Sequence, residues 1–201
     1  SRVFFTDLQH VVDDLLQFFN MITARYPDKP IFMYGHSMGS LIALQFTLQN
    51  QSRLKGLVLT GTAITGDELQ PNWLISLTHT FAKITPQLRA TPSLPVSTLS
   101  SDEEQVALYV ADPLVDKKMW KVGTASAMLR ACKSIRGQIP NLTLPLLVMH
   151  GADDELTPPS GSRYIQDHAS STDKTVKIMD GMRHELVNEV ERDAIIREIA
   201  D

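Results

Sequence analysis

Hydrophobic residues in the segment 7–26 recur at intervals of three and four positions. That spacing puts them on one face of a helix, which Pro27 ends. A short apolar run at 31–34 predicts a buried strand, the apolar positions of 40–48 predict a second helix, and the run at 54–60 predicts a second strand. A strand, a helix and another strand in succession are typical of parallel pairing in an α/β fold.

The pattern changes in the segment 62–141, which holds six prolines with helical patches between them and no clear strand. Alternation then returns in a strand at 144–150, a helix at 159–168, a strand at 175–180 and a helix at 189–200. We therefore predict an α/β domain with a mostly parallel sheet, formed by residues 1–61 and 142–201. The segment 62–141 is predicted to be an inserted, mostly helical subdomain.

The sequence Gly35-His36-Ser37-Met38-Gly39 joins the first predicted strand to the second helix. A G-x-S-x-G turn in this context is typical of the nucleophile of serine hydrolases. The glycines leave room for a sharp turn that exposes the serine, and the N–H of Met38 at the helix start is expected to bind an oxyanion. The alternative is a glycine-rich turn that only packs a helix against a strand.

A serine hydroxyl needs a base to remove its proton and an acid to orient that base. Asp153, Asp154 and Glu155 follow the third predicted strand, and the residue pattern does not separate these three candidate acids. His184 follows the fourth strand and is the histidine that comes after the acid loop on a strand-end loop. The order serine, acid, histidine is the order of α/β-hydrolases.

Four segments, spread along nearly the whole chain, carry a family resemblance: Tyr34–Ser40, Ala111–Val115, Leu144–Asp154 and Asp173–Ile178. They resemble the monoacylglycerol lipase family of α/β-hydrolases, to which lysophospholipases are related. The H-G-x-x-D pattern of that family falls on His150, Gly151 and Asp154, so the resemblance implies Asp154 as the acid and His184 as the base. It also implies an α/β-hydrolase fold in which the segment 62–141 is a helical cap over the active site.

The resemblance implies hydrolysis of a monoacylglycerol through an acyl-enzyme, with release of a fatty acid and glycerol. A lysophospholipase or a general carboxylesterase is the alternative within the same chemistry, and a non-catalytic binding scaffold is the alternative outside it. No cofactor or metal is implied: His184-Glu185 begins like the zinc helix H-E-x-x-H, but Asn188 takes the place of the second histidine.

An apolar stripe within the predicted insert suggests a further feature of the substrate. Its members recur at intervals of three and four: Leu74, Leu77, Phe81, Ile84 and Leu88. The pattern alone favours packing onto the main domain over lining an acyl channel or touching a membrane. The resemblance shifts the balance toward an acyl channel and transient contact of the cap with a membrane surface.

Composition narrows the range of partners. The 201 residues are 43% hydrophobic with a net charge of -4 and contain no Lys/Arg-rich run, which argues against nucleic acid as a partner. The single cysteine, Cys132, permits no internal disulfide. We expect a cytoplasmic location that leaves peripheral membrane contact open, and we find no signal for the oligomeric state.

The length bears on the fold. An α/β-hydrolase usually has several strands before its nucleophile strand and a loop that donates a second oxyanion N–H. Only 30 residues precede Ile31, and they contain one predicted helix. We therefore expect four parallel strands here, with the N-terminal strands and the second donor absent from this sequence. On this expectation, the chain alone is neither stably folded nor active.

Overall fold

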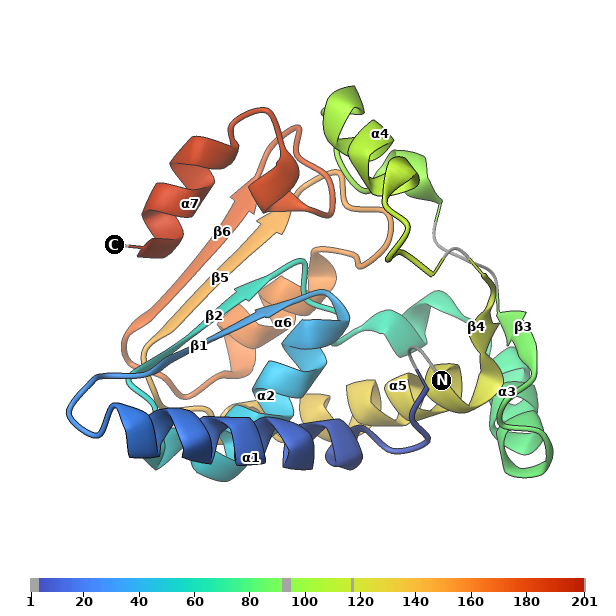
Figure 1. Ribbon diagram of the computed structural model, residues 1–201, viewed down its shortest axis with the longest axis horizontal. Coiled ribbons are helices and arrows are strands. Elements are labelled where there is room, and N and C mark those ends of the chain that lie inside the picture. The colour runs from blue at the N-terminus through green and yellow to red at the C-terminus, as the bar shows by residue number, and fades with distance from the viewer. Residues whose placement is uncertain (1–3, 92–94, 117, 201) are drawn as a thin grey trace.

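The computed structural model describes residues 4–91, 95–116 and 118–200. Its main sheet has four strands, which are β1 (Phe32–His36), β2 (Gly56–Thr60), β5 (Leu146–Gly151) and β6 (Lys174–Met179). All neighbours pair in parallel in the order β1-β2-β5-β6 (Figure 1). The four predicted strands and their parallel pairing are confirmed, and the carboxyl ends of all four strands lie at one edge of the sheet.

Helices lie on both faces of this sheet (Figure 1). They are α1 (Leu8–Arg25), α2 (Met38–Asn50) and α6 (Ser160–His168) on one face and α7 (Arg192–Ala200) on the other. Asp7 caps α1 by accepting a hydrogen bond from the Gln9 N–H at 2.9 Å. The last helix begins three residues later than the pattern predicts, because a short 3-10 turn precedes it.

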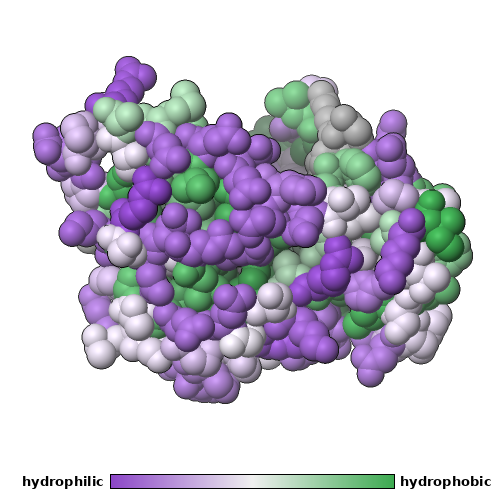
Figure 2. Space-filling view, turned by 90° about the horizontal axis from the view of Figure 1, so that it is seen from below, coloured by the Kyte–Doolittle hydropathy of each residue, from purple (hydrophilic) through white to green (hydrophobic). Residues whose placement is uncertain are grey.

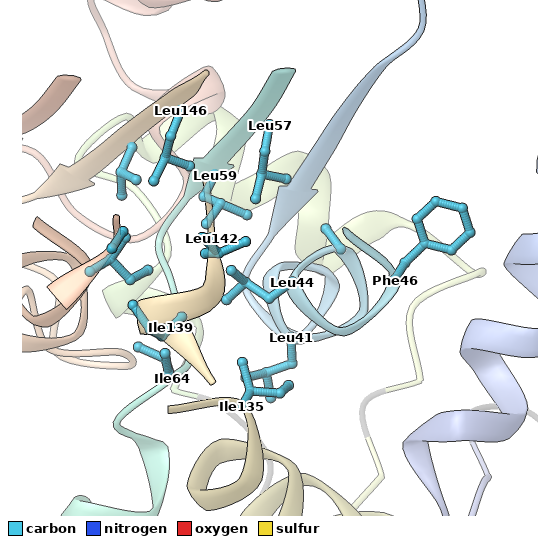
Figure 3. Packing of buried hydrophobic residues seen from close by; sticks show 14 of the residues in the cluster. Leu41, Leu44, Phe46, Leu57, Leu59, Ile64, Ile135, Ile139, Leu142 and Leu146 are labelled. Atoms are coloured by element: carbon cyan, nitrogen blue, oxygen red, sulfur yellow. The ribbon is translucent and has the colours of Figure 1, made fainter. Parts of the chain in front are cut away.

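The larger hydrophobic core lies between the sheet and α2 (Figure 3). Its fully buried members include Leu41, Leu44 and Phe46 of α2 and Leu57 and Leu59 of β2. Each such side chain contributes about 1.5–3 kcal/mol by its removal from water. This core fixes α2 against β1 and β2, so the turn between β1 and α2 rests on a tightly packed base.

The segment 62–141 contains α3 (Asn72–Ile84), α4 (Glu103–Ala111) and α5 (Val122–Arg136), and an antiparallel pair formed by β3 (Arg89–Thr91) and β4 (Trp120–Lys121). The strand pair is a departure from the prediction of no strand. Its strands are too short for an alternating pattern. A hydrogen bond of 3.0 Å between Arg89 and Asp116, which lie far apart in the sequence, accompanies the pairing.

The segment is not separate from the main core in its packing. Ala131, Cys132 and Ile135 of α5 are buried in the same cluster as the leucines of the sheet. Helix α3, in contrast, has no buried residue and packs against α5.

The apolar stripe of α3 is largely exposed. Leu77 and Phe81 are each 43% exposed, Ile84 is 72% exposed and Leu88, beyond the helix, is 46% exposed. Hydrophobic side chains accordingly gather at the end of the molecule where α3 lies (Figure 2). The preference for packing onto the main domain is therefore wrong, because periodicity identifies a common face but not what that face meets. Within the described ranges, no helix is long and apolar enough to cross a membrane.

Candidate active site

Ser37 lies in the turn between β1 and α2 with a backbone that L-residues rarely adopt. Its φ is 54° and its ψ is -123°, and it is the one non-glycine residue with positive φ in the described part of the chain. Such a conformation costs about 1–3 kcal/mol and persists only where its surroundings impose it. The strain is therefore a property of the local fold around Ser37.

The two glycines of the G-x-S-x-G turn are not equivalent. A Cβ on Gly35 would lie 2.6 Å from both the Ala43 Cβ and the Gly39 carbonyl oxygen, so α2 can approach β1 only if residue 35 is glycine. A Cβ on Gly39 would meet nothing within 4 Å. The expectation that both glycines are needed to leave room for the turn is thus confirmed for Gly35 and wrong for Gly39.

Hydrogen bonds clamp the backbone of Ser37 from both sides. Its N–H donates to the Thr60 carbonyl at 3.1 Å, and its own carbonyl accepts from the N–H and the hydroxyl of Ser40 at 2.9 and 2.5 Å. The Ser37 Oγ has no hydrogen-bond partner among the described residues, and Met38 opens α2 directly beside it. A hydroxyl thus stands without a partner at the positive end of a helix.

His184 and Asp154 meet at the same edge of the sheet. The Nδ1–H of His184 donates to Oδ2 of Asp154 at 2.7 Å, and the two residues are only 2% and 5% exposed. Asp153 and Glu155, the other two candidate acids, are exposed. The structure therefore brings Asp154 to His184 and leaves the Nε2 of His184 without a hydrogen bond in the described chain.

The Asp154 carboxylate is held by several donors. Its Oδ1 accepts from the N–H groups of Leu156 and Thr157 at 2.8 and 2.9 Å. Its Oδ2 lies 2.9 Å from the Thr157 hydroxyl and 3.0 Å from Nε2 of His150. Burial would raise the pKa of Asp154, but the hydrogen bonds from His150 and His184 outweigh burial and hold this pKa well below its usual range. Asp154 is therefore an anion with a fixed orientation.

His150, the first residue of the H-G-x-x-D pattern, is a further member of this network, and no role was predicted for its side chain. It is fully buried, and its Nε2 lies near two acceptors, Asp154 Oδ2 at 3.0 Å and the Thr157 carbonyl at 2.6 Å. Nε2 must therefore carry the proton. Its Nδ1 lies 2.6 Å from the Ser162 hydroxyl. The H-G-x-x-D pattern relates His150 to Asp154 in sequence, but it does not show that the two side chains meet in a hydrogen bond.

Gly61 and Thr157 were also missed. Gly61 has a φ of 52°, and a Cβ there would lie 3.1 Å from the His184 ring, so this glycine makes room for the imidazole. The Thr157 hydroxyl lies 3.1 Å from the Gly61 carbonyl and 3.1 Å from His184 Nδ1. Neither residue belongs to a pattern that short motifs reveal.

His36 links the two halves of the site. Its ring centroid lies 4.8 Å from that of His184, and its Nδ1 lies 3.0 Å from the Thr60 hydroxyl. Burial and the neighbouring His184 lower the pKa of His36 to about 4. Since Ser37 follows His36 directly, the candidate nucleophile and His184 lie at the same edge of the sheet, although no hydrogen bond joins Ser37 to His184.

Comparison with known proteins gives the family. Residues 1–191 match the family described as serine aminopeptidase, S33. The chain belongs to this family of α/β-hydrolases. Among its relatives, a monoacylglycerol lipase of Mycolicibacterium smegmatis is 30% identical over 199 residues, which cover 99% of this chain and 71% of the relative. Mouse monoglyceride lipase is 30% identical over 190 residues, covering 94% of this chain and 63% of the relative.

Solved structures of the family share the fold described above. The crystal structure of Paleococcus ferrophilus monoacylglycerol lipase superposes with a TM-score of 0.82 at 25% identity, covering 94% of this chain and 73% of that one. The resemblance to the monoacylglycerol lipases and the α/β-hydrolase fold are thus confirmed, and the chain is of the lipase and esterase type. It spans 63% to 73% of the lengths of these three proteins.

Proposed function

We propose that this chain carries the catalytic site of a serine ester hydrolase, with Ser37 as nucleophile, His184 as base and Asp154 as acid. One observation carries the proposal: a buried 2.7 Å hydrogen bond fixes His184 to an ionised Asp154 at the strand edge where Ser37 is held in a strained turn. A chain that only bound ligands would have no physical need for this combination. Neither Asp153 nor Glu155 forms a hydrogen bond or ion pair with His184 in the described chain.

The reaction follows from the positions of the protons. The Nδ1–H of His184 points to Asp154, so Nε2 is the unprotonated nitrogen that accepts the proton of Ser37 as its oxygen attacks the ester carbonyl. The Met38 N–H at the start of α2 stabilises the oxyanion. The imidazolium then protonates the leaving alcohol, and a water molecule hydrolyses the acyl-enzyme by the same steps in reverse roles.

The substrate we propose is a monoacylglycerol, cleaved to a fatty acid and glycerol. The lipase relatives support this substrate, and the exposed apolar stripe of α3 supports an acyl chain as part of it. The segment 62–141 is proposed to form the cap of the site, and the α3 face is proposed to touch lipid during substrate capture. A lysophospholipase or a general carboxylesterase is the alternative within the same chemistry.

Turnover by the full-length protein tests this proposal. We expect kcat/KM for a monoacylglycerol to exceed that for a lysophosphatidylcholine and for a short p-nitrophenyl ester, and we expect Ser37→Ala to abolish all three activities. Ser52→Ala, at an exposed serine outside the site, is the matched control and should leave turnover unchanged. A preference for either other ester would replace the monoacylglycerol, and absence of any turnover in folded protein would favour a binding scaffold.

A further inference from the structure

A cavity lies between α3, α5 and the chain just before α1. Its volume is about 340 Å³, and it is lined by Thr6, His79, Ala82, Lys83, Gly123 and Arg130. None of the proposed catalytic residues lines it. The cavity therefore offers a site whose occupant need not be the ester substrate.

The charges that line this cavity are all positive or potentially positive. Lys83 and Arg130 are cationic, His79 lines the same cavity, and no Asp or Glu is among the lining residues. Neither Lys83 nor Arg130 forms an ion pair with any residue in the described ranges. The chain has a net charge of -4, so the local charge of this cavity, which holds two cations without a counter-ion, is opposite in sign to the net charge.

A buried hydroxyl fixes two of these groups. Ser126 of α5 is fully buried, and its Oγ accepts a hydrogen bond from Arg130 at 2.6 Å and lies 2.8 Å from Nδ1 of His79. Arg130 also donates to the Thr6 carbonyl at 2.7 Å. Because both of its acceptors are neutral, the guanidinium is oriented without being neutralised.

The same network sets the tautomer of His79. Since Ser126 Oγ accepts from Arg130, its own proton is available to His79 Nδ1, which leaves the proton of the neutral ring on Nε2. Burial lowers the pKa of His79, and the positive charges of Arg130 and Lys83 lower it further. The residues that line the cavity thus carry an imidazole N–H donor, a guanidinium and an ammonium group.

We infer that this cavity binds the phosphate group of a phosphomonoester. A phosphate carries a charge near -2 at neutral pH and several strong acceptor oxygens, which match two unpaired cations and an additional N–H donor. The volume is at the lower end of the range of small-molecule sites, so it fits a phosphate with a small organic group. The phosphate can come from a free metabolite or from the headgroup of a lipid, and the experiment distinguishes the two sources.

Three probes test the inference on the full-length protein at constant ionic strength. Inorganic phosphate and glycerol 3-phosphate are titrated by calorimetry, and phosphatidylcholine vesicles with and without phosphatidic acid are tested by co-sedimentation. Binding of the soluble phosphates assigns a free ligand, whereas binding only to vesicles that contain phosphatidic acid assigns a lipid headgroup. If none of the three probes binds, the inference is wrong.

Matched variants locate the binding. Lys83→Gln should weaken binding of the effective probe at least about tenfold, because it removes one of the two unpaired cations. Lys133→Gln removes the same charge from an exposed position of α5 outside the cavity and should leave binding unchanged. An equal loss in both variants would mean general attraction to a positive surface and would overturn the site.

A spectroscopic readout does not depend on any substitution. The ring resonances of His79 should shift on addition of the effective probe, while those of His10, exposed on α1, should not. Binding without a shift at His79 would place the phosphate elsewhere and would contradict the inference.

Discussion

The two halves of the candidate site are built by different means. On the acid and histidine side, Asp154 accepts two backbone hydrogen bonds and contacts His150, Thr157 and His184, all buried. On the nucleophile side, the hydroxyl of Ser37 is free of hydrogen bonds in the described chain, and its position is set by backbone strain. Orientation thus comes from a polar network on one side and from close packing of α2 on the other.

The two halves are therefore sensitive to different kinds of substitution. A network of buried hydrogen bonds loses function when one donor is removed, because the remaining partners are left unpaired. A strained turn loses its geometry when its packing is relaxed or overfilled. The substitutions below separate these two kinds of support.

The largest effect is expected at Ser37 itself. Ser37→Ala and Ser37→Gly should both lower kcat by at least about 10³-fold, because each removes the nucleophile. Only glycine accepts the positive φ without strain, so Ser37→Gly should be about 1 kcal/mol more stable than Ser37→Ala. Chemical denaturation of both variants measures this difference, and equal stability would argue against strain at this residue.

The two glycines of the turn give the next comparison. Gly35→Ala should lower the free energy of unfolding by about 3 kcal/mol, because its Cβ would collide with Ala43 and the Gly39 carbonyl. Gly39→Ala lies in α2 with open space around it and should be neutral or stabilising by up to about 1 kcal/mol. Urea unfolding of the pair measures both values. Similar losses in both variants would contradict the role assigned to α2 packing.

His150 tests the polar half. His150→Phe should lower kcat about 10- to 100-fold, because Asp154 loses a charge-assisted hydrogen bond. It should also move the acidic limb of the kcat/KM profile to higher pH, because Asp154 loses one of the hydrogen bonds that lower its pKa and is then protonated at a higher pH. His168→Phe is the control, because the hydrogen bond and the ring contact of His168 are both with Tyr164 and not with Asp154. A loss of stability with an unchanged pH profile would leave His150 a purely structural role.

The smallest effect is expected from lowering the pH, which should reduce the stability of the fold through His36. The pKa of His36 is about 4 in the fold, against 6.5 for a free side chain, so the unfolded state binds the extra proton between these values. The free energy of unfolding is therefore not reduced by His36 at neutral pH. It falls as the pH drops below about 6.5, and the loss is about 1 kcal/mol at about pH 5.5. Chemical denaturation of the wild type and of His36→Gln, each at neutral pH and at about pH 5.5, checks this. An equal loss of unfolding free energy in the two proteins would exclude His36 as the cause.

The sequence predicted the strands and the main helices because their apolar periodicity reports burial directly. It also predicted that Ser37 would sit in a turn between β1 and α2, since the motif requires a strand before it and a helix after it. It could not identify the β3–β4 pair, the open surroundings of Gly39 or the exposure of the α3 stripe, because each depends on distant parts of the chain. The roles of His150 and Thr157 were not predicted, because they arise from contacts with Asp154 that form only when the acid loop folds.

Covalent labelling of the folded full-length protein with a fluorophosphonate, followed by peptide mapping, tests directly whether Ser37 is the nucleophile. We expect a single phosphonylated site at Ser37, with labelling slowed by Asp154→Asn and unaffected by Ser52→Ala. Labelling at another serine, or none at Ser37 in protein shown to be folded, would contradict this expectation.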